Sequence, residues 1–114
     1  MELNVENVLG QMLQAGADEF GENWGQVSTF ATVEFKKIAE TVVDIAKNVA
    51  EYKLDPEKGY PVEVGKMLLE MQKKSTEAVL VGLTALTLLA VERAINAVLK
   101  VLKDTFSGIL DTLL

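Results

Sequence analysis

The sequence predicts an all-α protein, a small bundle of three to four helices built on a long antiparallel helical hairpin and completed by association between chains. Three observations predict this fold class. Apolar residues recur at spacings of three and four along most of the 114 residues, which is the period of a helix with one buried face. The only prolines, Pro56 and Pro61, lie in one short turn. The stretch from Ala78 to Val91 has no charge, so other helices must cover it.

The first expected element is an amphipathic helix over 4–20, within a single domain that spans 1–114. Its apolar residues fall on one stripe, Val5, Val8, Leu9, Met12 and Leu13. Gly10 and Gly16 weaken this helix, because an interior glycine costs about 1 kcal/mol relative to alanine. We expect Trp24 to pack the corner between this helix and the next, and its alternative role is that of an interface anchor.

The second expected helix spans 29–53 and carries a heptad-like apolar seam. The seam consists of Phe35, Ile38, Val42, Ile45, Val49 and Tyr52. Its start has rival signals: Asn23 and Gln26 have the spacing of a capping box, and Ser28 and Thr29 are also good caps. The prolines then end the helix, and the short turn predicts that the next helix runs antiparallel to it.

The third expected helix spans 61–104 and has no strong internal stop. Unbroken, it would be about 65 Å long, against about 36 Å for the second helix, so one cannot cover the other. Either it bends near Ser75 or Gly82, or its far half packs on the first helix or on another chain. The remaining segment, 105–114, is amphipathic and is expected to dock.

The third helix carries two apolar seams, which predicts two packing partners and therefore a homo-oligomer or a partner helix. One seam is large, and the other narrows from Leu68 and Met71 to small residues, which allow close approach of helix backbones. The residues expected at the interface are Val81, Leu88, Val91, Ile95, Val98, Leu102, Ala78, Gly82 and Ala85.

Composition excludes several classes of function. The net charge is −6, and the first third of the chain holds six acidic residues and no basic one, which argues against nucleic acid and anionic membranes as partners. The chain has no histidine and no cysteine, so it lacks the commonest general base and the commonest transition-metal ligands. Glu63, Glu70 and Glu77 repeat along one helix face beside lysines, which is typical of a solvated ion-pair ladder. We expect no cofactor and no metal.

These patterns favour a non-enzymatic structural or protein-interaction subunit that self-assembles through apolar helix seams. The alternative is a helical bundle that binds lipid or another apolar ligand at a membrane surface. A third hypothesis, a carboxylate-based metal-binding or enzymatic bundle, needs a cavity lined by at least two of Glu34, Glu40, Glu63 and Glu70. The N-terminus lacks a signal peptide and the uncharged stretch is too short to span a bilayer, so we expect a cytoplasmic protein.

Overall fold

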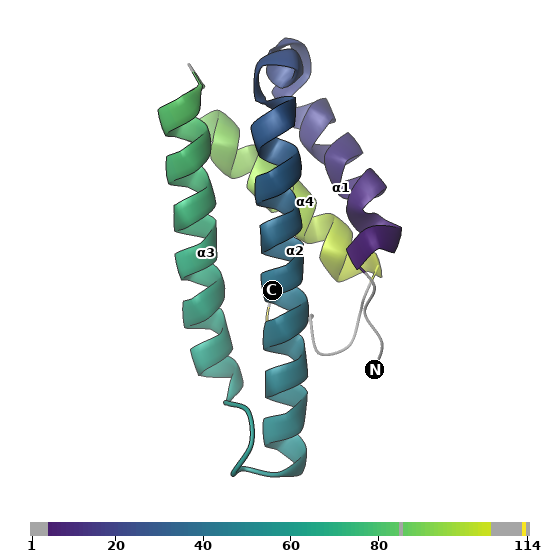
Figure 1. Ribbon diagram of the computed structural model, residues 1–114, viewed down its shortest axis with the longest axis vertical. Helices are drawn as coiled ribbons and strands as arrows, with labels where there is room; N and C mark the ends of the chain where they lie inside the picture. The colour runs from purple at the N-terminus through teal and green to yellow at the C-terminus, as the bar shows by residue number, and fades with distance from the viewer. Residues whose placement is uncertain (1–4, 85, 106–112, 114) are drawn as a thin grey trace.

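The computed structural model describes residues 5–84, 86–105 and 113, and in these residues the all-α prediction is confirmed. The described part contains a short 3-10 helix, η1, and four α-helices, without any strand. Their bounds are α1 Val5–Phe20, η1 Gly21–Asn23, α2 Trp24–Leu54, α3 Val62–Leu83 and α4 Leu88–Thr105. In Figure 1, α2 runs the length of the molecule, α3 lies beside it, and α1 and α4 pack together at one end.

The second helix starts earlier than the sequence predicts. η1 leads directly from α1 into α2, which begins at Trp24 instead of residue 29. Asn23 has helical dihedral angles, φ −81° and ψ −7°, and its side chain makes no capping hydrogen bond. Asn23 therefore occupies the cap position that the capping-box spacing predicts, but the predicted capping hydrogen bond is absent, because a cap residue must leave the helical region before its side chain can reach the backbone N–H groups that follow.

α2 and α3 form the antiparallel hairpin, joined by a turn in which backbone groups bond locally. The Asp55 amide donates to the Glu51 carbonyl, and the Lys58 amide donates to the Asp55 carbonyl. Gly59 adopts φ +62°, a left-handed conformation that favours glycine. This conformation lets the next amide, that of Tyr60, donate to the Asn48 carbonyl of α2.

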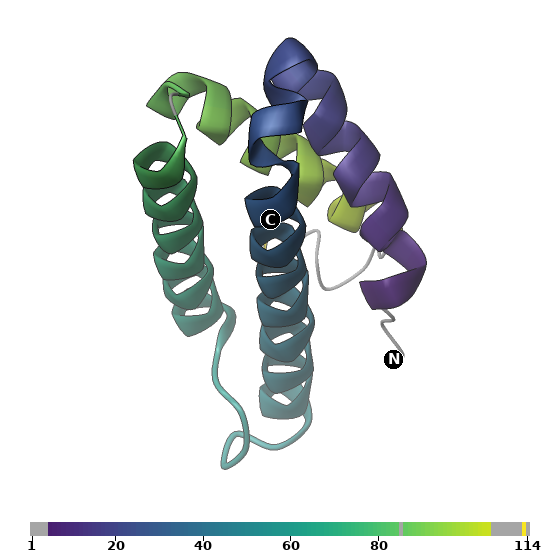
Figure 2. The same ribbon diagram turned by 45° about the horizontal axis from the view of Figure 1, so that its top comes forward.

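The expected helix over 61–104 is two helices in the structure. α3 ends at Leu83, Thr84 is extended at φ −132°, and α4 begins at Leu88. The Thr84 hydroxyl donates to the Leu80 carbonyl and accepts from the Leu86 amide, while the Thr87 hydroxyl accepts from the Ala90 amide. Such local side-chain bonds compete with a continuous helix. The break lets α4 turn back across α2 and pack along α1 (Figure 2).

The core extends along α2 from Val27 to Val49, where residues of α1, α3 and α4 pack against it. Among its fully buried large side chains are Val8, Met12, Phe35, Ile38, Ile95 and Leu102. Glycine permits two close helix contacts: a Cβ at Gly16 would lie 2.5 Å from the Phe35 ring, and one at Gly65 would lie 2.6 Å from Ile45 Cγ2. α1 and α3 thus both approach α2 through a glycine. The expected C-terminal segment, 105–114, lies outside the described residues except for Thr105, the last residue of α4, and the buried Leu113.

Candidate functional site

The large apolar seam predicted for the oligomer interface divides between the core and the surface. Four of its residues, Val91, Ile95, Val98 and Leu102, are fully buried within the single chain. They belong to α4, whose main neighbour is α1. In the single chain these four side chains are covered by the chain's own helices, and their place in an oligomer interface stays a prediction.

The other predicted interface residues lie at or near the surface. Leu88 is 50% exposed, Val81 is half-buried, and Ala78 and Gly82 are exposed on α3. Ala85 lies outside the described residues.

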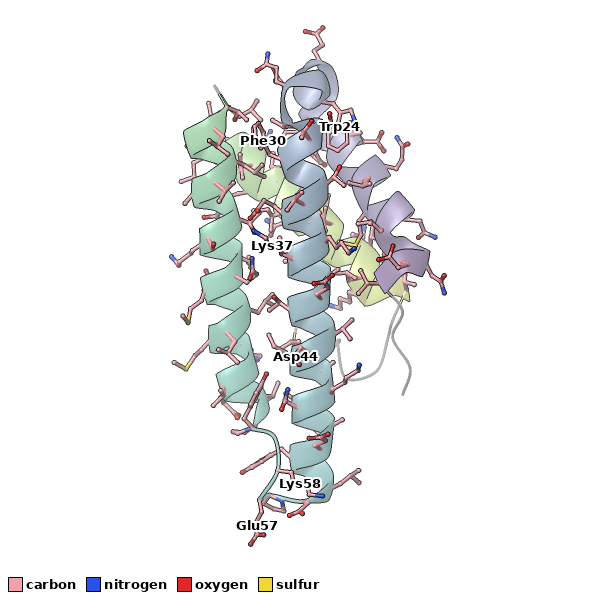
Figure 3. The ribbon with its side chains drawn as sticks, in the orientation of Figure 1. Trp24, Phe30, Lys37, Asp44, Glu57 and Lys58 are labelled. Carbon is pink, nitrogen blue, oxygen red and sulfur yellow. The ribbon has the colours of Figure 1, made fainter. Side chains whose placement is uncertain are left out.

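Trp24 lies at the corner between α1 and α2, where the sequence predicts it. It is half-buried, and its ring stacks on that of Phe20 with the ring centroids 6.2 Å apart. Figure 3 shows Trp24 at the end of the bundle where α1 meets α2. Its contact with Phe20 accounts for the aromatic side chain at this position, and its role as an interface anchor stays a prediction.

One apolar stripe of α3 faces away from the core, and we call it the α3 stripe. It consists of Val64, Met67, Leu68, Met71, Ser75, Ala78 and Gly82, all of them exposed. Met67 and Met71 are each 66% exposed, which is unusual for side chains of this size on one helix face. The stripe tapers, since its large residues lie in the first half of α3 and its small residues in the second.

A second group of exposed apolar side chains lies at the hairpin end next to the break. It consists of Phe30, Val33, Leu83, Leu88 and Leu89, and we call it the break-end patch. Phe30 and Leu83 lie at the same level of the hairpin. The Thr41 hydroxyl donates a hydrogen bond to Gln72, so these two residues lie opposite each other on the antiparallel helices. Phe30 lies eleven residues before Thr41 in α2, and Leu83 lies eleven residues after Gln72 in α3, so they are also opposite each other.

A polar groove of about 590 Å³ runs between α2 and α3 on the face shown in Figure 3. Lys37 and Asp44 of α2 line it, as do Leu68 and Met71 of the α3 stripe. The Thr41 hydroxyl donates to Gln72, whose amide nitrogen in turn donates to the buried Thr76 hydroxyl, 3.3 Å in each case. The first of these bonds joins α2 to α3, and the second lies within α3.

Tyr60 also lines this groove. Its hydroxyl oxygen is buried and has no hydrogen-bond partner among the described residues. Burial raises the pKa of Tyr60 above its ordinary value of 10.0, and the negative charge of Asp44 raises it further. The phenol is therefore held in its neutral form.

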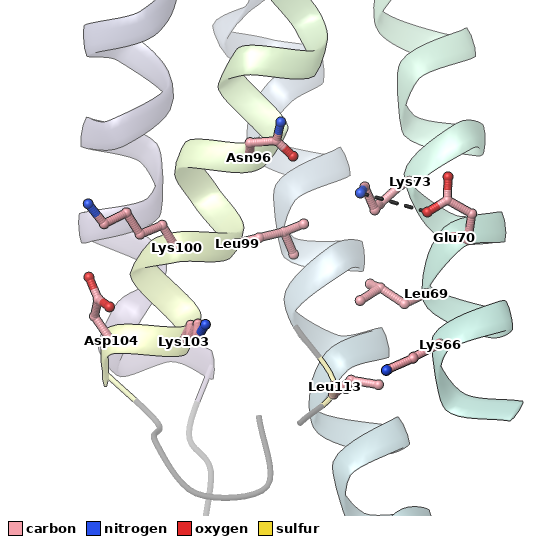
Figure 4. A pocket seen from close by; sticks show the side chains of 10 residues that line it. All are labelled: Lys66, Leu69, Glu70, Lys73, Asn96, Leu99, Lys100, Lys103, Asp104 and Leu113. Atoms are coloured by element: carbon pink, nitrogen blue, oxygen red, sulfur yellow. Dashed lines mark ion pairs between the residues drawn. The ribbon is translucent and has the colours of Figure 1, made fainter. Parts of the chain in front are cut away.

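A second groove, of about 680 Å³, lies between α3 and α4, and we call it the lysine groove. Its lining combines apolar and charged side chains: Leu69, Leu99, Leu113, Asn96, Lys66, Lys73, Lys100, Lys103, Glu70 and Asp104. Figure 4 shows Leu99 of α4 and Leu69 of α3 pointing toward one another, with Lys66 and Lys73 directed from α3 into the gap. The groove exists only because the break folds α4 back beside α3.

The carboxylates that an enzymatic or metal-binding bundle would need lie apart. Glu34 is buried and bonds Lys37 at 2.9 Å, Glu40 lines the groove between α2 and α3, and Glu70 lines the lysine groove. Glu63 is exposed near the start of α3. Within the described residues, no three acidic side chains gather in a way that would hold a metal ion.

Comparison with family models, with curated proteins and with solved structures found no significant match to this chain. Within the helices that the structure describes, none is both long enough and apolar enough to cross a membrane.

Proposed function

We propose that this protein is a non-enzymatic interaction subunit that associates with a second copy of itself through the α3 stripe. The observation that carries the proposal is the taper of that stripe. Its large residues precede Met71 and its small residues follow it, while its neighbour α2 leaves the whole stripe exposed. Exposed apolar surface arranged in this way is typical of an interaction site.

The taper matches an antiparallel pair of α3 helices. In a two-fold interface, residue i of one copy meets residue j of the other, and j meets i. With Met71 at the axis, Val64 meets Ala78 and Met67 meets Ser75, because each pair of residue numbers adds to twice 71. At these two pairs on each side of the axis a large side chain opposes a small one, which fills that part of the interface without overlap. A parallel pair would place large residues against large and small against small.

The interface therefore differs from the one that the sequence alone favours. The buried seam of α4 stabilises the single chain, and the surface offered to a partner is the second, narrowing seam. Methionine suits such a surface, because its flexible thioether side chain adapts to the shape of its partner.

The test uses the absence of cysteine, which makes any introduced cysteine the only one in the chain. Met71→Cys places two thiols at the two-fold axis, and we expect it to form a covalent dimer under mild oxidation. Leu54→Cys is the matched control: Leu54 is 89% exposed but lies off the stripe, at the end of α2, and should crosslink far less. Equal crosslinking of the two variants would contradict the pairing.

Molar mass in solution gives a second measurement. Light scattering behind a sizing column, over a hundredfold range of concentration, should show a dimer that Met71→Glu converts to a monomer, because two like charges would meet at the axis. Leu89→Glu changes the break-end patch instead and should leave the dimer intact. If Leu89→Glu dissociates it and Met71→Glu does not, the interface lies at the break-end patch and the proposal is wrong.

A further inference from the structure

The lysine groove carries positive charge that the described part of the chain does not neutralise. Of its four lysines, Lys73 pairs with Glu70 at 3.7 Å. Within the described residues, no carboxylate oxygen lies within 4.0 Å of the amine of Lys66, Lys100 or Lys103. An ammonium group beside a partly closed groove gains most from an anionic partner.

The sign of this charge is opposite to that of the whole molecule. Among the described residues that line the groove, four are lysines and two carry carboxylates, which gives these residues a charge of +2, whereas the chain as a whole carries −6. Four of the eleven basic residues of the chain are thus gathered at one groove. Such a local reversal favours an anion over a cation or a neutral molecule.

The floor of the groove is apolar. Leu69, Leu99 and Leu113 line it, and all three are buried. They come from α3, from α4 and from the C-terminal end of the chain, so the floor spans three separate segments. An apolar floor with charged groups above it suits a ligand that has an apolar part and a charged part.

We propose that the lysine groove binds a single-chain amphiphile with an anionic head, a carboxylate or a phosphate ester. The alkyl chain lies along the leucine floor between α3 and α4. The head lies between Lys66 of α3 and Lys103 of α4, neither of which pairs with a carboxylate among the described residues. The groove volume, about 680 Å³, is within the range of small-molecule sites, about 300–1,000 Å³.

The proposal is tested by isothermal titration of the full chain with dodecanoate and dodecyl phosphate, each below the concentration at which it forms micelles. We expect one molecule of either to bind per chain, with an affinity that falls as salt is added. Dodecanol and dodecyltrimethylammonium have the same alkyl chain without the negative charge and should bind at least about tenfold more weakly, a difference of about 1.4 kcal/mol. Equal binding of all four probes would overturn the proposal.

Variants locate the site. The double variant Lys66→Gln, Lys103→Gln should bind dodecanoate at least about tenfold more weakly, with dodecanol unaffected. The matched control, Lys53→Gln with Lys58→Gln, removes the same charge near the turn and should bind as the original chain does. Glu70→Gln should strengthen binding, because it removes a negative charge from the groove and frees Lys73. If the two double variants weaken binding equally, the groove is not the site.

A flotation assay separates a free amphiphile from a lipid surface as the source of the anionic head. In vesicles of phosphatidylglycerol the anionic head groups face the solution, while the alkyl chains of the lipid stay in the bilayer and cannot enter the groove. We expect the protein to bind monomeric dodecanoate and to stay with the unbound fraction when such vesicles float. Flotation of the protein without binding of monomeric dodecanoate would overturn the proposal.

Because the groove lies apart from the α3 stripe, Met71→Glu should leave dodecanoate binding unchanged. The proposal of ligand binding and the proposal of self-association can therefore fail independently.

Discussion

α3 and α4 come from one stretch of sequence without a strong internal stop, yet they are held in the molecule in different ways. α4 has 18 residues and buries six of them, Val91, Ala94, Ile95, Val98, Leu99 and Leu102, all apolar. α3 has 22 residues and buries four, Gly65, Leu69, Thr76 and Leu80. α4 packs along α1, whereas the main neighbour of α3 is α2.

The difference shows that apolar periodicity and core formation are separate properties. Both helices have a repeating apolar face, but only that of α4 is placed where other helices can cover it. α3 is held by a glycine contact, a few buried side chains and a relay of polar side chains. It therefore keeps an apolar surface for a partner, while α4 stabilises the fold. Three substitutions test this division.

The largest effect is expected from a charge placed in the seam of α4. Ile95 is fully buried, and Ile95→Asp would bury a carboxylate among apolar side chains, which should lower the free energy of unfolding by about 4 kcal/mol or more. Met67→Asp introduces the same charge at a 66% exposed position of α3. It should change the free energy of unfolding by about 0.5 kcal/mol or less. Urea denaturation followed by circular dichroism measures both, at a concentration at which the chain is monomeric. Similar losses in the two variants would contradict the comparison.

An intermediate effect is expected at the contact between α3 and α2. Gly65→Ala would place a Cβ 2.6 Å from Ile45 Cγ2 and 3.3 Å from Val49 Cγ2, so the Ile45 side chain or one of the two helices must shift. We expect a loss of about 1–3 kcal/mol. Gly10→Ala is the control, because Gly10 is exposed inside α1 with no atom within 4 Å of the added Cβ, and it should stabilise the protein by about 0.5–1 kcal/mol. If Gly65→Ala is also stabilising, α3 is held less closely than the structure indicates.

The smallest effect is expected at Tyr60. Its hydroxyl is buried without a partner, so Tyr60→Phe should raise stability at pH 8 by about 1 kcal/mol or less. The raised pKa of Tyr60 means that the folded state favours the neutral phenol. The neutral Tyr60 phenol therefore contributes to the free energy of unfolding below pH 10, and this stabilisation is lost as the pH rises through the folded-state pKa. Tyr60→Phe should therefore lose less stability than the original chain between pH 8 and pH 11, measured by urea denaturation at both pH values.

The helical class, the hairpin and the first helix follow from periodicity and from the two prolines, but the break in the third segment does not. Threonine is tolerated inside helices at a small cost, so Thr84 and Thr87 give no strong stop signal. Their hydroxyl bonds to local backbone groups become visible only in the structure. Once the break is missed, the partner of the α4 seam is missed too, because periodicity shows which face is buried and not what covers it.

The lysine groove was beyond sequence reasoning for the same reason. Lys66 and Lys73 stand out in the sequence as part of an ion-pair ladder, whereas Lys100 and Lys103 lie about thirty residues further along the chain. Only the reversal of chain direction between α3 and α4 brings the two pairs together (Figure 4). A charge pattern read along one continuous helix would place them tens of ångströms apart.

The length of α2 has a consequence for how this molecule can be altered. α2 has 31 residues, and its last turns extend with α3 beyond the ends of α1 and α4 (Figure 1). That end of the molecule is an arm two helices thick, with the exposed residues Glu57 and Lys58 at its tip. Adding seven residues to each helix of the arm would move the tip outward by about 10 Å without touching the packing of α1 against α4. The arm is thus a place where length can change, in evolution or by engineering, while the bundle that supports it stays the same.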